Sequence, residues 1–197
     1  MDRKYFFNQH AKEWDFTRHP EEEVRLERVV MLAEIQCGQS VLDVGTGTGV
    51  LIPHLLRAVG PSGSIVAFDL SHEMLNAARL KGFPCNVTLI EADVHDAPFK
   101  DAEFDRVICN AALPHFHDKV RSLREMVRVL RPGGVLVVSH PIGREAVNKL
   151  HREVGGPVEE DRVPPPDVMS VLLASVNLID IEVIDEPEFY LARARKP

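Results

Sequence analysis

The sequence lacks the features that mark several large classes of protein. Its cysteines, Cys37, Cys85 and Cys109, are three in 197 residues and form no CxxC pair. An odd number of scattered cysteines predicts reduced thiols and argues against a disulfide framework or a zinc knuckle. No apolar run approaches the roughly 18 residues that span a bilayer, and charges interrupt the apolar residues of the first segment, unlike a secretory leader. These absences predict a cytoplasmic protein without a membrane span.

Positive charge is also scarce. Lysine and arginine number 23 against 30 acidic residues, which gives a formal net charge of −7. Because no long basic run is present, the sequence offers no surface that would neutralise nucleic-acid phosphates. We therefore expect a small-molecule partner and no nucleic acid, while the oligomeric state stays open. With 45% hydrophobic residues, the chain is long enough for one compact domain and hardly for two.

Strand and helix patterns alternate after Gly38. The strand patterns are almost wholly apolar, as expected where helices cover both faces of a sheet. Alternation of this kind predicts parallel strands joined by crossover helices, hence a doubly wound α/β sheet. We expect turns at residues 60–63, 82–84 and 132–134 and helices at residues 50–59, 71–81 and 119–130.

The two ends of the chain have other patterns. Residues 3–36 predict two helices, the first from Tyr5 to Trp14 and the second after an acidic start at residues 21–23. Beyond Pro141 we expect helices at residues 144–154 and 167–175. The last two strand patterns lie too close together for a crossover helix, so they predict an antiparallel hairpin around residues 186–187.

The most specific segment is VLDVGTGTG at residues 41–49, in which a strand runs into a glycine-rich turn and then a helix. Gly45 permits a sharp exit from the strand, Gly47 lets a ligand approach the backbone, and Gly49 lets the helix pack on the strand. Open α/β sheets bind ligands at this edge. A dinucleotide turn of the form GxGxxG would need a third glycine where the chain has Val50, so the spacing favours another ligand.

This segment resembles motif I of the class I S-adenosylmethionine-dependent methyltransferases, (V/L)LDxGxGxG, and the small-molecule type is the one expected here. The likeness continues through DLSHEML, EADVHDAPF, FDRVICN and LRPGGVL, and it covers about residues 39–140. It implies S-adenosyl-L-methionine as methyl donor and S-adenosyl-L-homocysteine as product. The implied fold is a single seven-stranded, mostly parallel sheet in the order 3-2-1-4-5-7-6, with the last strand antiparallel and helices on both faces.

The family resemblance also implies a division of residues 1–197, expected to form a single methyltransferase domain. Residues 1–37 would form a helical cap, residues 38–140 the cofactor-binding core, and residues 141–197 the acceptor-side helices and the hairpin.

The resemblance gives individual residues a role toward the donor. The carboxylate of Asp43 would lie near its amino-acid end, and Asp93 would accept a hydrogen bond from the adenine amino group. A carboxylate at the position of Asp69 can accept hydrogen bonds from both ribose hydroxyls, or it can merely cap the next helix. The candidate cofactor-binding residues are Asp43, Gly45, Thr46, Gly47, Gly49, Asp69, Leu70, Met74, Asp93, Val94 and Asn110.

The acceptor side is less specific. Methyl transfer from a sulfonium is an in-line displacement, so alignment and exclusion of water dominate, and a base is needed only where the acceptor loses a proton. The (N/D)PPY motif of nucleobase and glutamine-amide methyltransferases is missing, because residues 110–113 are Asn-Ala-Ala-Leu. The sequence therefore favours an unidentified small-molecule methyl acceptor.

Polar residues after the fourth and fifth strands are the acceptor-side candidates. They are His115, His117 and Asp118, then His140, then the helical stripe Arg144, Asn148 and His151. Our hypothesis is that His115 or His140 orients the acceptor or acts as a base, and that Arg144 holds an anionic part of it. The alternative is that each is a loop, capping or solvent-exposed residue.

No glutamate or cysteine at a suitable spacing completes a metal-ligand set with these histidines, so we expect no metal. Two other functions stay open: a non-catalytic protein that keeps the donor pocket, and a dinucleotide-dependent oxidoreductase.

Overall fold

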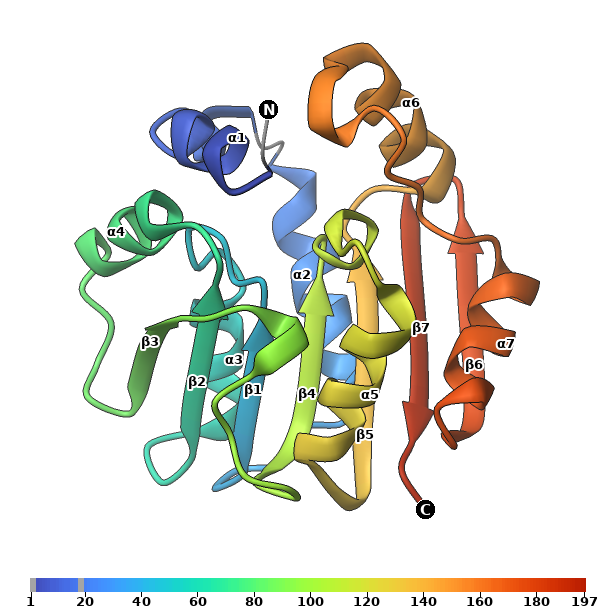
Figure 1. Ribbon diagram of the computed structural model, residues 1–197. Helices are drawn as coiled ribbons and strands as arrows, with labels where there is room; N and C mark the ends of the chain where they lie inside the picture. The colour runs from blue at the N-terminus through green and yellow to red at the C-terminus, as the bar shows by residue number, and fades with distance from the viewer. Residues whose placement is uncertain (1–2, 18–19) are drawn as a thin grey trace.

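The computed structural model describes residues 3–17 and 20–197. Seven strands form one sheet in the order β3-β2-β1-β4-β5-β7-β6, with helices on both faces (Figure 1). Strands β1 to β5 pair in parallel, whereas β7 runs antiparallel to both β5 and β6. The predicted fold class and strand order are thereby confirmed. Among the described residues, no helix is both long enough and apolar enough to cross a membrane.

The central strands are buried because helices cover them on both sides. The strands are β1 (Ser40–Val44), β2 (Ser64–Asp69), β3 (Val87–Glu91), β4 (Phe104–Asn110), β5 (Leu130–His140), β6 (Ile179–Glu186) and β7 (Phe189–Arg195). The helices are α1 (Arg3–His10), α2 (Glu21–Leu32), α3 (Ile52–Val59), α4 (His72–Leu80), α5 (Lys119–Val129), α6 (Arg144–Val154) and α7 (Pro166–Ser175). The described residues also form four short 3-10 turns: η1 (Trp14–Thr17), η2 (Val94–Asp96), η3 (Leu113–His115) and η4 (Gly156–Val158).

Two apolar clusters hold the helices to the sheet. Leu26 and Val29 of α2 and Leu55 of α3 are buried in one cluster. Leu123 of α5 and Leu173 of α7 are buried in the other. Capping side chains fix two helix starts, since Ser71 accepts a hydrogen bond from the amide of Met74 and Asp118 accepts one from that of Arg121.

Two local predictions differ from the structure. The first helix ends at His10, before Trp14, because the amide of Glu13 turns back to the carbonyl of His10 and the chain enters η1. The expected turn at residues 132–134 lies inside β5, where Leu130 pairs with Phe104 and the pairing resumes at Val135 after a register shift. The expected cap at residues 1–37 includes residues 1–2 and 18–19, which lie outside the described residues.

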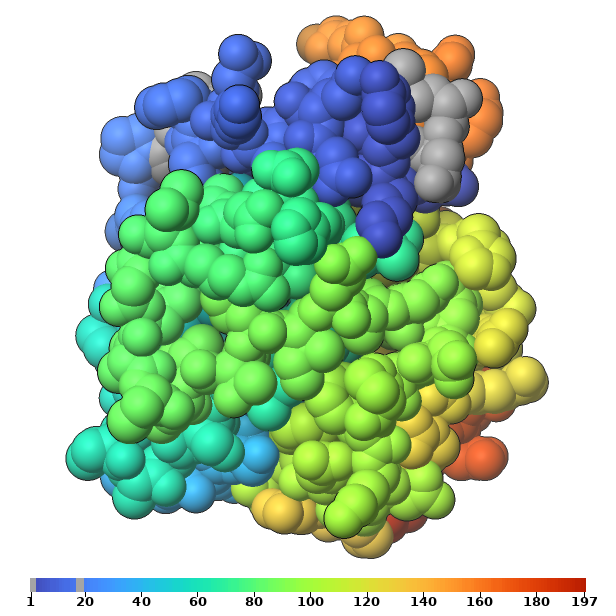
Figure 2. All heavy atoms as spheres, turned by 60° about the vertical axis from the view of Figure 1, so that its left-hand side comes forward, coloured from blue at the N-terminus to red at the C-terminus, as the bar shows by residue number. Residues whose placement is uncertain are grey.

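The carboxyl ends of β1, β2 and β4 meet at one edge of the sheet, and α1 lies over that edge (Figure 1). The amino-terminal segment is seated on the body of the molecule, next to the green residues that include α4 (Figure 2). Ser71 donates to Oδ1 of Asn8 at 2.7 Å, and Lys4 pairs with Glu91 at 2.7 Å. The start of the chain thus covers the edge where this fold binds ligands.

Candidate donor and acceptor site

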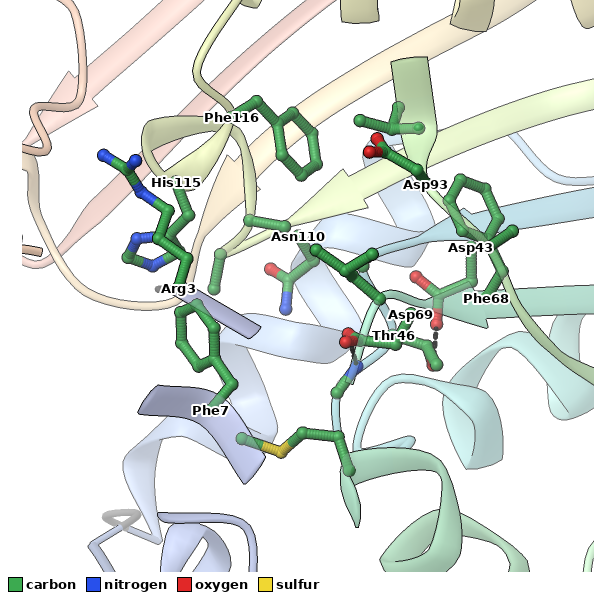
Figure 3. Close-up of a pocket in the computed structure, with 18 of the residues that line it drawn as sticks. Arg3, Phe7, Asp43, Thr46, Phe68, Asp69, Asp93, Asn110, His115 and Phe116 are labelled. Atoms are coloured by element: carbon green, nitrogen blue, oxygen red, sulfur yellow. Dashed lines mark hydrogen bonds between the residues drawn. The ribbon is translucent and has the colours of Figure 1, made fainter. Parts of the chain in front are cut away.

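A pocket lies at this edge of the sheet, and residues of α1 form part of its wall (Figure 3). Its volume is ≈ 320 Å³, within the range of small-molecule sites. The predicted site residues that line it are Asp43, Gly45, Thr46, Gly47, Asp69, Leu70, Met74, Asp93, Val94, Asn110, His115 and His117. Gly49, His140 and Arg144 are not among the lining residues.

The three glycines of the turn after β1 serve different ends. All three have positive φ: 69° at Gly45, 57° at Gly47 and 77° at Gly49. A Cβ at Gly45 would lie 2.5 Å from Cβ of Ala112, and one at Gly49 would lie 3.1 Å from Phe83. A Cβ at Gly47 would meet nothing within 4 Å. Gly45 and Gly49 therefore permit internal packing, whereas Gly47 leaves open space in the pocket wall.

Asp69 ends β2 and ties the glycine turn to the start of α4. Its Oδ2 accepts a hydrogen bond from the amide of Gly47 at 2.9 Å, and its Oδ1 accepts one from the amide of Ser71 at 2.8 Å. Burial raises the pKa of Asp69, and these two backbone hydrogen bonds oppose the rise. The carboxylate both lines the pocket and holds the next helix start, so the two roles considered from the sequence are compatible.

Asp43 is the most buried acid of the pocket, with 1% of its surface exposed. Its Oδ2 accepts a hydrogen bond from Oγ1 of Thr46 at 2.7 Å. Burial raises the pKa of Asp43 to about 7, the Thr46 hydrogen bond opposes the rise, and the charge of Asp69 adds to it. No cationic side chain within the described residues pairs with this carboxyl. A cationic ligand group would therefore favour its ionised form.

Asp93 lies at the same end of the pocket as Asp43 and Phe68 (Figure 3). Its Oδ1 accepts from the amide of His95 at 2.9 Å and lies 2.7 Å from Nδ1 of the His95 ring. Burial raises the pKa of Asp93, but these contacts prevail and hold it below its ordinary value. The His95 ring in turn stacks on His117, with centroids 3.9 Å apart. Asp93 is thus a fixed, ionised acceptor at the pocket wall.

His115, Arg3 and Phe7 gather at the opposite end (Figure 3). Nδ1 of His115 lies 2.8 Å from Oδ2 of Asp161, and the Phe7 ring packs edge-on against the imidazole at 5.0 Å between centroids. Between the two ends, Asn110 lines the pocket, and its Oδ1 accepts from the hydroxyl of Ser139 at 2.9 Å. The acceptor-side candidate His115 therefore shares one pocket with the donor-side candidates.

The other two residues of the acceptor hypothesis, His140 and Arg144, do not line the pocket. His140 is 3% exposed at the end of β5, and its Nε2 has no hydrogen-bond partner in the described part of the chain. Burial lowers the pKa of His140 to about 3, with His115 and His151 adding to the effect. Arg144 forms ion pairs with Asp185 at 2.8 Å and with Glu145 at 2.7 Å. Neither residue faces the pocket as the sequence hypothesis required.

The remaining members of the helical stripe brace a loop. Oδ1 of Asn148 accepts from the amide of Val163 at 2.8 Å, and Nδ1 of His151 lies 2.9 Å from the carbonyl of Asp161. The stripe predicted to face the acceptor therefore packs on residues 161–163, apart from Arg144 at its outer end. Within residues 3–17 and 20–197, no group of three or more His, Cys, Asp or Glu side chains is arranged to hold a metal ion.

Sequence reasoning missed the pocket residues contributed by the first segment, and it missed Asp161. Arg3, Phe7 and Trp14 line the pocket, although the sequence marked them only as residues of a helical segment. Asp161 stands in an acidic loop with no motif around it, and it bonds to a side chain 158 positions away. The aromatic pattern of residues 5–14 was a usable signal for Phe7 and Trp14, whereas no pattern in the sequence marked Arg3 or Asp161.

A doubly wound seven-stranded sheet of this order, with a glycine turn after β1 and carboxylates after β2 and β3, defines the class I methyltransferase fold. The family described as methyltransferase domain matches residues 42–138. A crystal structure of a SAM dependent methyltransferase from Aquifex aeolicus superposes with a TM-score of 0.75 at 25% identity, covering 95% of this chain and 97% of that one. The chain belongs to the class I S-adenosylmethionine-dependent methyltransferase family.

Two curated relatives match part of the chain more closely. The ubiquinone/menaquinone biosynthesis C-methyltransferase UbiE of Hahella chejuensis is 42% identical over 108 residues, which are 53% of this chain and 43% of that protein. The protein of the same name from Vibrio cholerae is 40% identical over 121 residues, 58% of this chain and 46% of that protein. The chain thus spans less than half the length of these relatives.

Proposed function

We propose that this chain binds S-adenosylmethionine in the pocket and transfers its methyl group to a small aromatic acceptor of the quinone-precursor type. The observation that carries the proposal is that one pocket brings together the buried carboxyl of Asp43 and the open face of Gly47 with aromatic and basic side chains, among them Phe7 and His115. The bound donor would supply an activated sulfonium methyl group. The protein then has to orient two ligands and exclude water.

The donor end fits the chemistry of this donor. Asp43 is a buried carboxyl without a cationic partner among the described residues, so it suits the donor's ammonium group. The open face of Gly47 admits close approach of a ligand to the backbone. Asp69 stands beside that gap and can accept from ribose hydroxyls, while Leu70 and Met74 offer apolar surface for the adenine ring.

The acceptor end favours a planar, electron-rich molecule. Phe7, Phe116 and Trp14 offer ring faces and edges, and Arg3 and His115 supply donors for a hydroxyl or an oxyanion. The two partial relatives are named as C-methyltransferases of ubiquinone and menaquinone biosynthesis. A ring carbon of a hydroquinone is therefore the first acceptor to test.

Calorimetry with S-adenosylmethionine, S-adenosylhomocysteine and NAD tests the donor. We expect both sulfur ligands to bind and NAD to show no heat; tight NAD binding alone would favour the oxidoreductase. A transfer assay with methyl-labelled donor then compares hydroquinones, phenols, thiols and amines, with mass spectrometry to locate the label. Donor binding without transfer to any class would favour the non-catalytic alternative.

A further inference from the structure

A histidine, a carboxylate and an arginine from three distant segments meet at the acceptor end of the pocket. Nδ1 of His115 lies 2.8 Å from Oδ2 of Asp161, and Nη2 of Arg3 lies 2.6 Å from Oδ1 of the same carboxylate. The side chain of Asp161 is 4% exposed and that of His115 is 13% exposed. A largely buried carboxylate is thus held between an imidazole and a guanidinium.

The contact with Asp161 fixes the tautomer of neutral His115. Burial raises the pKa of Asp161, but the hydrogen bonds from His115 and Arg3 prevail and hold it below its ordinary value. Because an ionised carboxylate only accepts, Nδ1 carries the hydrogen and Nε2 carries the lone pair. Nε2 makes no hydrogen bond to residues 3–17 or 20–197, and the ring lines the pocket.

His115 is distinguished from the two histidines clustered with it. The ring of His151 lies 4.9 Å from that of His115, but its Nδ1 contacts the carbonyl of Asp161 and the ring does not line the pocket. His140 is buried below the pocket lining. A base needs an exposed lone pair within reach of the reacting group, and of the three only His115 faces the ligand space.

We propose that His115 is the general base of methyl transfer and that Asp161 is its positioning residue, so that the acceptor carries a weakly acidic hydroxyl and takes the methyl group on that phenolic oxygen or on a ring carbon that the hydroxyl activates. The proposal rests on the proposed function. The hydroxyl proton passes to Nε2 of His115, the electron pair that it leaves forms the bond to the methyl carbon from the oxygen or, through the ring, from the activated carbon, and the pair of the broken carbon–sulfur bond stays on sulfur. Where the carbon is methylated, it then loses its own proton to solvent as the ring becomes aromatic again, and the oxygen regains a proton. The positive charge thereby moves from sulfur to the imidazolium, where Asp161 stabilises it.

Several charged groups surround this pair and bear on any pH dependence. Arg3 projects from α1, Asp69 ends β2, and Lys119 of α5 acts on Asp161. His140 at the end of β5 and His151 of α6 face His115 from the other side. Because each of these groups influences the proton affinity of the site, a test should rely on the direction in which the pH profile shifts and not on the size of the shift.

The experiment compares the methyl-transfer kinetics of Asp161→Asn, His115→Gln and Arg3→Gln in the full chain. The acceptor probe is a hydroquinone with an unsubstituted ring carbon. We expect His115→Gln to lower kcat on the order of 100-fold and Asp161→Asn about tenfold, with S-adenosylhomocysteine affinity within about twofold of the original. The acid limb of the kcat profile should move to lower pH in Asp161→Asn, because the imidazolium loses its carboxylate. It should move to higher pH in Arg3→Gln, because a competing cation is lost.

Two exposed pairs supply controls. His72→Gln removes a histidine paired with Glu91, and Asp180→Asn removes a carboxylate paired with Arg195 at a residue whose φ of 51° asparagine tolerates. Both should leave the kcat profile unchanged. Opposite shifts in Asp161→Asn and Arg3→Gln would not arise if Asp161 merely fastened α1.

Long-range ¹H–¹⁵N spectra give a readout without any acceptor. Neutral His115 should show its proton on Nδ1, and Asp161→Asn should relax that preference. A proton on Nε2, or an unchanged profile in His115→Gln of an active enzyme, would overturn the dyad. Absence of donor binding or of any transfer by the unmodified chain would instead count against the proposed function.

Discussion

The two ends of the pocket are built in different ways. At the donor end, the contacts join residues close in the chain or on neighbouring strands, such as Thr46 with Asp43 and Gly47 with Asp69. At the acceptor end, α1 meets a loop 158 positions later through Arg3 and Asp161. The parallel sheet alone positions the donor end, whereas the acceptor end exists only after the first and last parts of the chain have docked.

The buried charges of the two ends also differ in kind. The donor end buries acids, and burial raises the pKa of both Asp43 and Asp69. Near the acceptor end, burial lowers the pKa of two imidazoles, those of His140 and His151. Burial thus moves these pKa values in opposite directions at the two ends, so Asp43 and His140 should respond in opposite directions to pH.

The largest expected effect is at the glycine turn. Gly47→Val puts a branched side chain at φ 57° and into the open pocket face, so donor binding should fall more than about 100-fold. Gly82→Val is the matched control, because Gly82 has φ 67°, equally open surroundings and no place in the pocket lining. Calorimetry with S-adenosylhomocysteine measures both. Equal affinity in the two variants would show that the donor does not approach Gly47.

The next effect is at the end of β2. Asp69→Ala removes a carboxyl acceptor, held by the amides of Gly47 and Ser71, from a partly enclosed site, so S-adenosylhomocysteine binding should weaken by roughly 2–3 kcal/mol. Asp105→Ala is the comparison, since Asp105 also accepts from a backbone amide, that of Ser40 at 2.8 Å, but lies at the start of β4. Asp105→Ala should lower the free energy of unfolding and leave the affinity for S-adenosylhomocysteine unchanged. Unchanged affinity in folded Asp69→Ala would remove that carboxylate from the donor site.

The same contrast explains how far the sequence could be interpreted. The doubly wound sheet and the hairpin were predictable because apolar strands, glycine turns and crossover spacing are local signals. The strand order and the donor-side roles of the motif residues between Asp43 and Asn110 came from the family resemblance. The contact of Asp161 with Arg3 and His115 depends on tertiary docking, which leaves no periodicity in the sequence. The helical stripe of α6 was assigned to the pocket because spacing shows which residues share a face, not what that face meets.

A third prediction uses the opposite pH responses. The pKa of Asp43 is raised from 3.8 to about 7, so its contribution to stability is present at low pH and is lost as pH rises through that interval. The pKa of His140 is lowered from 6.5 to about 3, so its contribution is lost as pH falls between those values. For each group, the free energy of unfolding changes by at most about 1.4 kcal/mol per pH unit.

Urea unfolding of the ligand-free chain at pH 5 and pH 7.5 separates the two. Asp43→Asn should gain stability relative to the original as pH rises, and His140→Gln should gain as pH falls. Each variant is compared with itself at the two pH values. Any change in packing free energy that the substitution causes at both pH values therefore cancels. Parallel pH curves for Asp43→Asn and the original chain would mean that the carboxyl is solvated enough to ionise at its ordinary pKa.

The smallest effect is expected at Arg144, where the sequence hypothesis placed an acceptor-binding group. In the structure, the Arg144 guanidinium donates to Asp185 of β6 at 2.8 Å, and Arg144 does not line the pocket. Arg144→Ala should therefore lower stability by about 0.5 kcal/mol, as exposed ion pairs do, and leave methyl transfer within about twofold. Asp185→Asn breaks the same pair from the other side and should match it in both measurements. A tenfold loss of transfer confined to Arg144→Ala would show that the side chain leaves Asp185 to reach the acceptor, and the acceptor end would then extend past His115 to α6.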